Sequence, residues 1–142
     1  MLHETCSEIR VRYAETDQMG VVYYANYLVW CEIGRTDFMR SLGRAYAEVE
    51  AQGVRLAVSE ATVRYRASAR YDEWVDVRTR LIDSRSRALT FSYQIVHRER
   101  GVLADATTSL VSLAQDGRVA ALPTDLRGLM HDAVAPDFSR GR

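Results

Sequence analysis

The residue best placed to do chemistry is Asp17, which lies in a polar turn between a predicted strand and a long predicted helix. Backbone N–H groups at a helix start stabilise negative charge, and one such donor to an oxyanion is typically worth about 3–4 kcal/mol of activation free energy. A carboxylate beside them could attack a carbonyl carbon or activate a water. The alternative is that Asp17 only accepts hydrogen bonds from nearby backbone amides. Residue spacing alone favours this structural alternative.

The other residues with catalytic or metal-binding chemistry show no usable pattern. His3, His97 and His131 lie near a terminus, at a strand end and near the tail, and we expect no catalytic role for them. Cys6 and Cys31 are too far apart in sequence for a zinc knuckle or a C-x-x-C redox motif. The sequence has no nucleophile elbow and no glycine-rich phosphate loop. We therefore expect reduced thiols, no metal site and no cofactor.

Length and charge limit the possible partners. With 142 residues the chain has room for one domain, so residues 1–142 are expected to fold as a single unit. The 19 basic residues, all arginine, balance 19 acidic ones, and no segment gathers the basic excess that binds nucleic acid. No signal peptide is recognisable and no apolar run approaches the roughly 20 residues of a membrane span, so we expect a cytoplasmic protein.

Hydrophobic periodicity predicts the elements that position Asp17. Residues 8–13 alternate as a half-buried strand does, and residues 24–42 form a nearly uninterrupted helix ended by Gly43. The helix is apolar on most sides, which predicts burial on most sides. Gly34 in its middle costs about 1 kcal/mol against alanine, so another backbone from an enclosing sheet is expected to pass close to it. We also predict short helices at 46–51 and 124–131, and strands at 54–67, 74–82, 89–95 and 102–113.

The order of these elements defines the fold class. One strand and one long helix precede four strands, with turns at residues 98–101 and at Asp116-Gly117 that suit hairpins. This order predicts an α+β fold rather than a parallel βαβ repeat. We expect an antiparallel sheet of about five strands wrapped around one long central helix.

The residues around Asp17 resemble a known family. The run RVRYAETDQMGVVYYANY, which ends at Tyr27 and continues to Glu32 and Arg35-Thr36, is similar to the signature of the 4-hydroxybenzoyl-CoA thioesterase-like branch of hotdog acyl-CoA thioesterases. A weaker match at residues 65–73 has Ser68 where the family often carries proline. The resemblance implies hydrolysis of an acyl-CoA, with a short aliphatic or an aromatic acyl group, to the free acid and CoA. Some members are linked to the Tol-Pal cell-envelope system.

The resemblance also implies roles for particular residues. Asp17 matches the catalytic aspartate, which acts as a nucleophile or as a general base for water. The backbone N–H of Tyr24 matches the oxyanion donor, and Gly20 lets the loop pack beside the thioester. Many relatives carry histidine where this chain has Tyr24, so any assistance from an imidazole is missing here.

Three further matching positions have two interpretations each. Glu32 either faces the acyl pocket or forms an ion pair with Arg35 one turn along the helix. Asn26 and Tyr27 either bond the loop or line the acyl channel, and we expect the structural role for Asn26.

The family also implies an assembly and a way to hold CoA. Members pair as homodimers, often as homotetramers, with the active site at the dimer seam. Arginine side chains near that seam are expected to bind the CoA phosphates, since a guanidinium matches phosphate geometry. The candidates are Arg66, Arg70, Arg85 and Arg87, although solvated strand faces explain these residues equally well.

Two other functions stay open from sequence. One is a non-catalytic hotdog protein that binds acyl-CoA or lipid, which the carboxylate at position 17 argues against. The other is hydration of an enoyl-CoA, which usually needs an aspartate and a histidine in one loop. No histidine follows Asp17 within the predicted helix, so the sequence disfavours the hydratase.

Overall fold

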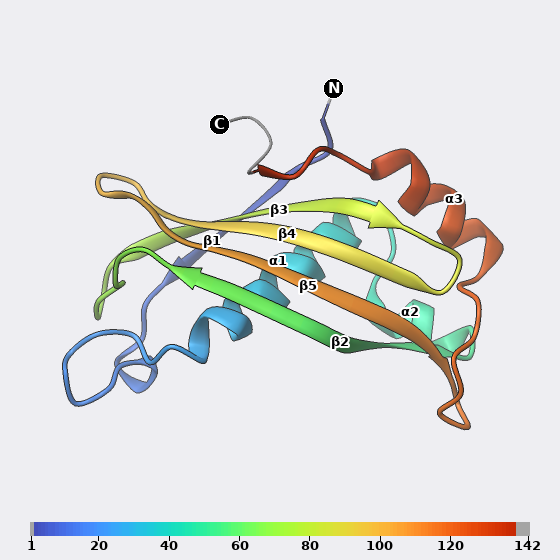
Figure 1. Ribbon diagram of the computed structural model, residues 1–142, viewed down its shortest axis with the longest axis horizontal. Coiled ribbons are helices and arrows are strands. Elements are labelled where there is room, and N and C mark those ends of the chain that lie inside the picture. The colour runs from blue at the N-terminus through green and yellow to red at the C-terminus, as the bar shows by residue number, and fades with distance from the viewer. Residues whose placement is uncertain (1, 139–142) are drawn as a thin grey trace.

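The computed structural model describes residues 2–138 and shows one curved sheet packed against one long helix (Figure 1). The strands are β1 (Thr5–Arg10), β2 (Val54–Tyr65), β3 (Trp74–Ser84), β4 (Ala88–His97) and β5 (Gly101–Ala114). The α-helices are α1 (Asn26–Ser41), α2 (Tyr46–Ala51) and α3 (Thr124–Ala133), and a single 3-10 turn, η1 (Tyr13–Glu15), follows β1. The predicted fold class is confirmed.

The sheet is antiparallel throughout, in the order β1-β3-β4-β5-β2. Strands β3, β4 and β5 form a meander, while β1 and β2 occupy the two edges. The turn into β5 and the turn after it each contain a glycine with positive φ, Gly101 at 82° and Gly117 at 86°. Such backbone angles suit glycine in tight hairpins, as the sequence predicted.

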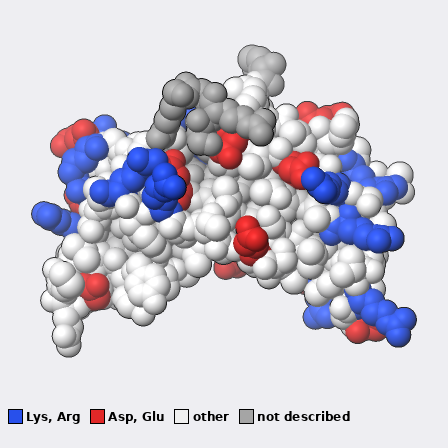
Figure 2. All heavy atoms as spheres, in the orientation of Figure 1, with Lys and Arg blue, Asp and Glu red and all other residues white. Residues whose placement is uncertain are grey.

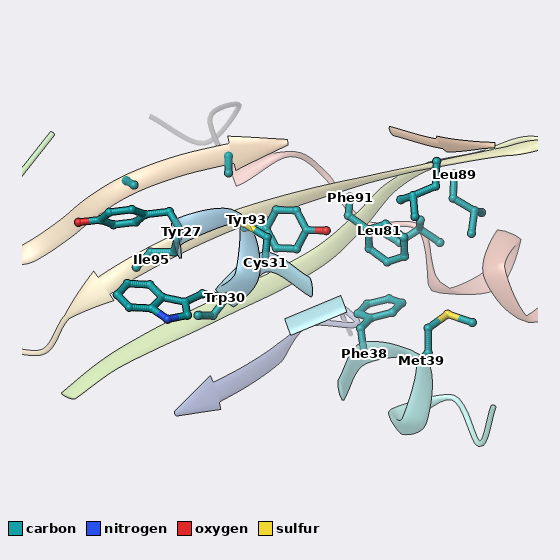
Figure 3. Close-up of a cluster of buried hydrophobic side chains, with 14 of the residues drawn as sticks. Tyr27, Trp30, Cys31, Phe38, Met39, Leu81, Leu89, Phe91, Tyr93 and Ile95 are labelled. Atoms are coloured by element: carbon teal, nitrogen blue, oxygen red, sulfur yellow. The ribbon is translucent and has the colours of Figure 1, made fainter. Parts of the chain in front are cut away.

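The core lies between α1 and the concave face of the sheet (Figure 3). Helix α1 packs against β1, β3 and β4. Large side chains from the helix face aromatic and aliphatic side chains from the strands, and all of them are buried; they are Tyr27, Trp30, Cys31, Phe38 and Met39 from α1, and Leu81, Leu89, Phe91, Tyr93 and Ile95 from the sheet. The central helix therefore holds the sheet through one continuous apolar stripe.

One side of α1 stays open, so the prediction that the helix is buried on most sides is wrong for the single chain. Leu28, Val29 and Ile33 keep 37%, 43% and 40% of their surface exposed. The reason is that α1 covers β1, β3 and β4, while a groove separates its exposed side from the edge strand β2. An apolar surface of this kind on a helix marks a place for another molecule.

Gly34 makes the predicted contact with the sheet, but side chains rather than backbone approach it. A Cβ atom built at Gly34 would lie 2.4 Å from Thr79 Oγ1 and 2.9 Å from Val77 Cγ1, both on β3. The absent side chain therefore lets α1 sit directly on β3.

Two predicted boundaries differ from the structure near Asp17. Strand β1 ends at Arg10 rather than Tyr13, because η1 begins at Tyr13 and leaves that ring 77% exposed. Helix α1 begins at Asn26 rather than Tyr24, because Asn26 N–H still donates to the Tyr23 carbonyl in a turn. The segment 11–25 is therefore a longer irregular loop than the sequence suggested.

The outer face of the sheet is covered in part by the C-terminal segment. Phe138 is buried there beneath two guanidinium groups, those of Arg78 and Arg80, which lie 5.0 and 4.1 Å from the ring centroid. Figure 2 shows this side of the molecule, with arginine side chains gathered toward its two ends and separate acidic side chains between them. Within residues 2–138, no helix is long and apolar enough to cross a membrane.

Candidate active site

Asp17 closes a tight turn in the loop before α1. Its N–H donates to the Val21 carbonyl at 2.9 Å, and Gly20 N–H donates to the Asp17 carbonyl at 3.0 Å. Gly20 has a φ of 79°, a value that favours glycine, and nothing lies within 4 Å of the place where a Cβ would be. The backbone angle of the bend therefore favours glycine at position 20. Among the described residues, no atom is close enough to exclude a side chain there.

The Asp17 carboxylate makes the turn contact that spacing suggested and keeps one oxygen available. Oδ1 accepts a hydrogen bond from Met19 N–H at 2.8 Å. Oδ2 accepts no hydrogen bond from any residue in the described part of the chain. Asp17 can therefore both stabilise the turn and take part in chemistry, because Oδ1 holds the side chain in place while Oδ2 stays available.

A buried carboxylate that sequence reasoning missed, Glu15, holds this loop against α1. Glu15 Oε2 accepts from Trp30 Nε1 at 2.8 Å, and Oε1 accepts from Arg12 N–H at 2.8 Å. The Glu15 carbonyl accepts from Tyr23 N–H at 2.8 Å and from Asn26 Nδ2 at 2.9 Å. The contact of Asn26 matches its expected structural role. The only sequence signal was the presence of Glu15 in the loop motif itself.

These contacts leave free amides at the start of α1. Within residues 2–138, the N–H groups of Tyr24 and Ala25 donate to no acceptor, while the next amide, that of Asn26, donates to the Tyr23 carbonyl. The dipole of α1 adds a partial positive charge at the same end of the helix. The Tyr24 segment can therefore stabilise a developing negative charge.

A pocket of about 330 Å³ lies between the Asp17 loop, the start of α1 and the end of β2. Its lining comprises Asp17, Val21, Val22, Tyr24, Tyr27, Tyr65, Arg66, Ala67 and Ser68. Tyr65 Oη donates to the Tyr24 carbonyl at 2.9 Å and so joins β2 to the helix start. Tyr27 Oη accepts from Ala69 N–H at 3.0 Å, and burial raises the pKa of this hydroxyl, which keeps it neutral. The pocket pairs one carboxylate with apolar and aromatic walls.

The structure separates the remaining candidates. Arg66 lines the pocket and contacts Asp105, with 2.5 Å between Nε and Oδ2. Arg85 and Arg87 lie in the turn between β3 and β4, at the end of the sheet away from the Asp17 loop (Figure 1). Arg70 is exposed beyond β2, and its N–H donates to Glu73 Oε1. Of the four arginines, only Arg66 is among the residues that line this pocket.

Glu32 lies outside the Asp17 pocket. It is exposed on α1 and lines a separate pocket together with Arg35. Arg35 is buried, and its Nη1 donates to Tyr93 Oη at 3.2 Å. The carboxylate and the guanidinium therefore border one hollow beside the helix.

The histidines do not reach the pocket. His97, the last residue of β4, has its Nε2 atom 3.2 Å from Oε2 of Glu73, which directly precedes β3. No group of three or more His, Cys, Asp and Glu side chains able to hold a metal ion occurs in residues 2–138.

The fold and the pocket define a class of protein: a hotdog fold, in which one sheet wraps a long helix whose N-terminus faces a loop carboxylate. Comparison with known proteins specifies the family. Residues 11–130 match the family described as the thioesterase-like superfamily, and the chain belongs to this family.

Individual relatives agree with this assignment. A protein of Bacillus subtilis named putative acyl-CoA thioesterase YneP is 37% identical over 115 residues, which cover 81% of this chain and 83% of that protein. The crystal structure of hypothetical protein TT1821 from Thermus thermophilus has a TM-score of 0.86 and 42% identity, covering 93% of this chain and 98% of that one. The DHNA-CoA thioesterase of Staphylococcus aureus has a TM-score of 0.88 and 31% identity, covering 91% and 89%.

Proposed function

We propose that the protein hydrolyses acyl-CoA thioesters, with Asp17 as the reactive carboxylate. The observation that carries this proposal is that Asp17, with Oδ2 available, and Tyr24, with its N–H free, line one pocket at the N-terminus of α1. The names of the relatives, an acyl-CoA thioesterase and a DHNA-CoA thioesterase, support the substrate class. The acyl group is either a short aliphatic chain or an aromatic ring, since aliphatic and aromatic side chains make up most of the pocket wall.

The proposed reaction begins with the thioester carbonyl oxygen at the Tyr24 N–H. Asp17 Oδ2 either attacks the carbonyl carbon or takes a proton from a water that attacks it. Negative charge then develops on the carbonyl oxygen, where the free amide and the dipole of α1 stabilise it. The C–S bond breaks, CoA leaves as a thiolate and takes up a proton, and in the general-base route water supplies the second oxygen of the free acid. If Asp17 attacks, a mixed anhydride forms first and water hydrolyses it.

The CoA portion would leave the pocket past Arg66, the candidate arginine at its edge. A guanidinium there is suited to a phosphate, although Asp105 competes for it at 2.5 Å. This proposal predicts that Arg66→Met raises the KM for acyl-CoA more than it lowers kcat.

We also propose that the protein works as a homodimer, in which a second copy covers the open side of α1. Leu28, Val29 and Ile33 form an exposed apolar strip beside the unpaired edge of β2. Burying such a strip is favourable by about 25 cal/mol per Å² of apolar surface. Light scattering should therefore give a mass of two or four times 16.1 kDa.

Thiol release from acyl-CoA tests the catalytic proposal. Asp17→Asn keeps an oxygen that can accept the Met19 N–H but removes the charge, and we expect kcat to fall by at least about a hundredfold. Asp116→Asn is the matched control, because Asp116 Oδ1 accepts Arg118 N–H at 3.0 Å in a similar turn after β5. The control should keep full activity. Undiminished turnover in Asp17→Asn would exclude Asp17 as the reactive group.

A further inference from the structure

One hydrogen bond joins two walls of the Asp17 pocket. Tyr65, the last residue of β2, donates from its hydroxyl to the Tyr24 carbonyl at 2.9 Å. Both residues line the pocket, Tyr24 from the segment just before α1 and Tyr65 from the edge strand. Since 41 residues separate them in sequence, the bond depends on the fold, which brings the end of β2 beside the helix start.

The Tyr65 hydroxyl is the better of two donors to the Tyr24 carbonyl. The other donor is Tyr27 N–H at 3.4 Å, which is longer than the usual range of about 2.7–3.2 Å. On the other side of Tyr24, the Tyr23 carbonyl accepts from Asn26 N–H at 2.9 Å, a bond that moves together with the helix start. In the described part of the chain, no second hydrogen bond ties the Tyr24 backbone to the sheet.

Aromatic packing holds the Tyr65 ring in place. The ring meets that of Tyr27 edge to face, with 5.2 Å between centroids and an angle of 83°. Tyr27 is itself buried, and its hydroxyl accepts Ala69 N–H at 3.0 Å. A phenylalanine at position 65 could make the same ring contact, so packing alone does not require a tyrosine there. Burial raises the pKa of the Tyr65 hydroxyl, which therefore stays protonated and able to donate.

The position of Tyr24 matters for the proposed reaction because its N–H is the donor to the developing oxyanion. Such a donor is effective when it lies about 2.7–3.1 Å from the oxyanion, and a misplacement of about 1 Å in an active site can lower the rate by about a hundredfold. Without Tyr65, the Tyr24 carbonyl gains freedom to turn toward the pocket. The negative end of that carbonyl would then oppose the charge on the thioester oxygen.

We infer that Tyr65 is a positioning residue, whose hydroxyl holds the Tyr24 backbone so that the Tyr24 N–H meets the thioester oxygen. This inference rests on the proposed thioesterase function. Tyr65 acts through Tyr24 and not on the reacting atoms themselves. Its hydroxyl should therefore matter more for the transition state, in which the charge develops, than for binding of the substrate.

Steady-state kinetics of Tyr65→Phe test the inference, with butyryl-CoA and benzoyl-CoA as substrates. The variant keeps the ring and loses only the hydroxyl. We expect kcat to fall about three- to tenfold, as for the loss of one hydrogen bond, and KM to change less than about twofold. A kcat within about twofold of the unmodified protein, or a raised KM with unchanged kcat, would overturn the inference.

Tyr71→Phe is the matched control. Tyr71 is also a partly exposed tyrosine packed edge to face on another ring, that of Tyr13, and its hydroxyl has no hydrogen-bond partner within residues 2–138. The control should keep its kcat, and an equal loss in both variants contradicts a specific role of Tyr65. Urea denaturation establishes that both variants are folded under the assay conditions.

Infrared spectroscopy provides a readout that a purely structural contact would not change. Asp17→Asn is expected to hold butyryl-CoA largely uncleaved, and comparison of the substrate with and without ¹³C at the thioester carbonyl isolates the C=O stretch. A hydrogen bond from Tyr24 N–H should move this stretch to lower wavenumber than in free butyryl-CoA. Adding Tyr65→Phe should move it back toward the free value. A stretch that is the same in the single and the double variant contradicts the inference.

Failure of this inference is distinguishable from failure of the thioesterase proposal. If hydrolysis depends on Asp17 but not on the Tyr65 hydroxyl, only the inference about Tyr65 is wrong. If the unmodified protein hydrolyses neither thioester, or if Asp17→Asn hydrolyses them equally well, the proposed function itself is wrong.

Discussion

Trp30 Nε1 donates a hydrogen bond to Glu15 Oε2 over 2.8 Å, and both side chains are buried. This contact joins the second turn of α1 to the loop that carries Asp17. The Glu15 side chain accepts the Arg12 N–H and the Glu15 carbonyl accepts the Tyr23 N–H, so this residue fixes the loop on both sides of Asp17. Glu15 is therefore a positioning residue for the proposed reaction.

Replacing Glu15 by glutamine tests this role. Glutamine has one carbonyl oxygen, so it can accept from Trp30 or from Arg12 but not from both. Since a hydrogen bond to a charged group contributes about 1.5–3 kcal/mol, we expect kcat to fall about tenfold or more, with a smaller change in KM. Steady-state kinetics measure the changes in kcat and KM. Tryptophan fluorescence reports whether the surroundings of Trp30 change.

The control for Glu15 is Glu48→Gln, on the exposed side of α2, which should behave like the unmodified protein. Trp30→Phe removes the other half of the contact and should lower kcat in the same direction. A drop in the free energy of unfolding with unchanged kcat would show that Glu15 supports the fold alone.

Isotope labelling separates the two proposed roles of Asp17. In a single turnover in H₂¹⁸O, a nucleophilic Asp17 passes one of its own oxygens to the acid when water attacks the carboxylate carbon of the anhydride, and ¹⁸O remains on the enzyme. A general base always yields ¹⁸O in the product acid. Attack of water on the acyl carbon would also label the acid, so hydroxylamine trapping of the anhydride completes the experiment. Mass spectrometry of the peptide that contains Asp17 gives the result.

Two helical glycines should respond oppositely to alanine. At Gly34 a Cβ would lie 2.4 Å from Thr79 Oγ1, so Gly34→Ala is expected to destabilise the protein by about 1–3 kcal/mol through overpacking. At Gly128 in α3 nothing lies within 4 Å, so Gly128→Ala should stabilise it by up to about 1 kcal/mol. Urea denaturation measures both values, and a neutral Gly34→Ala would show that α1 can move away from β3.

The stability of the protein should fall at alkaline pH. Burial raises the pKa of the Cys31 thiol to about 12, against 9.0 for a free cysteine. Because the folded pKa is the higher one, the neutral thiol contributes its stability below pH 9.0, and this contribution is lost as the pH rises towards about 12. Denaturation experiments across that pH range should show a smaller decrease in the free energy of unfolding for Cys31→Ala than for the unmodified protein. A thiol reagent should modify exposed Cys6 in the native state and Cys31 only after unfolding.

The sequence predicted the fold because its patterns are local. Alternation defined β3, β4 and β5, and the nearly uninterrupted apolar run that ends at Gly43 defined α1. The position of Asp17 in a turn was also readable from neighbouring polar residues. These features depend on contacts within a few residues, and period and turn chemistry encode such contacts directly.

The rest of the site depends on contacts between distant residues. Nothing in the spacing of Glu15 and Trp30 shows that they meet, and Tyr65 approaches Tyr24 only because β2 lies at the edge beside α1. The exposure of Ile33 was missed for a related reason. The sequence shows how much of the helix surface is apolar. How much of that surface is buried within one chain depends on the width of the sheet.

The attachment of the Asp17 loop also has a consequence for synthesis on the ribosome. Val22 N–H donates to the Ala69 carbonyl and Val11 N–H to that of Glu73, so the loop is completed by a segment made about fifty residues later. The first two strands of the chain become the outermost two, and each waits for a partner from the second half. The nascent chain therefore contains Asp17 early, but the Asp17 loop is completed only after most of the chain has been translated.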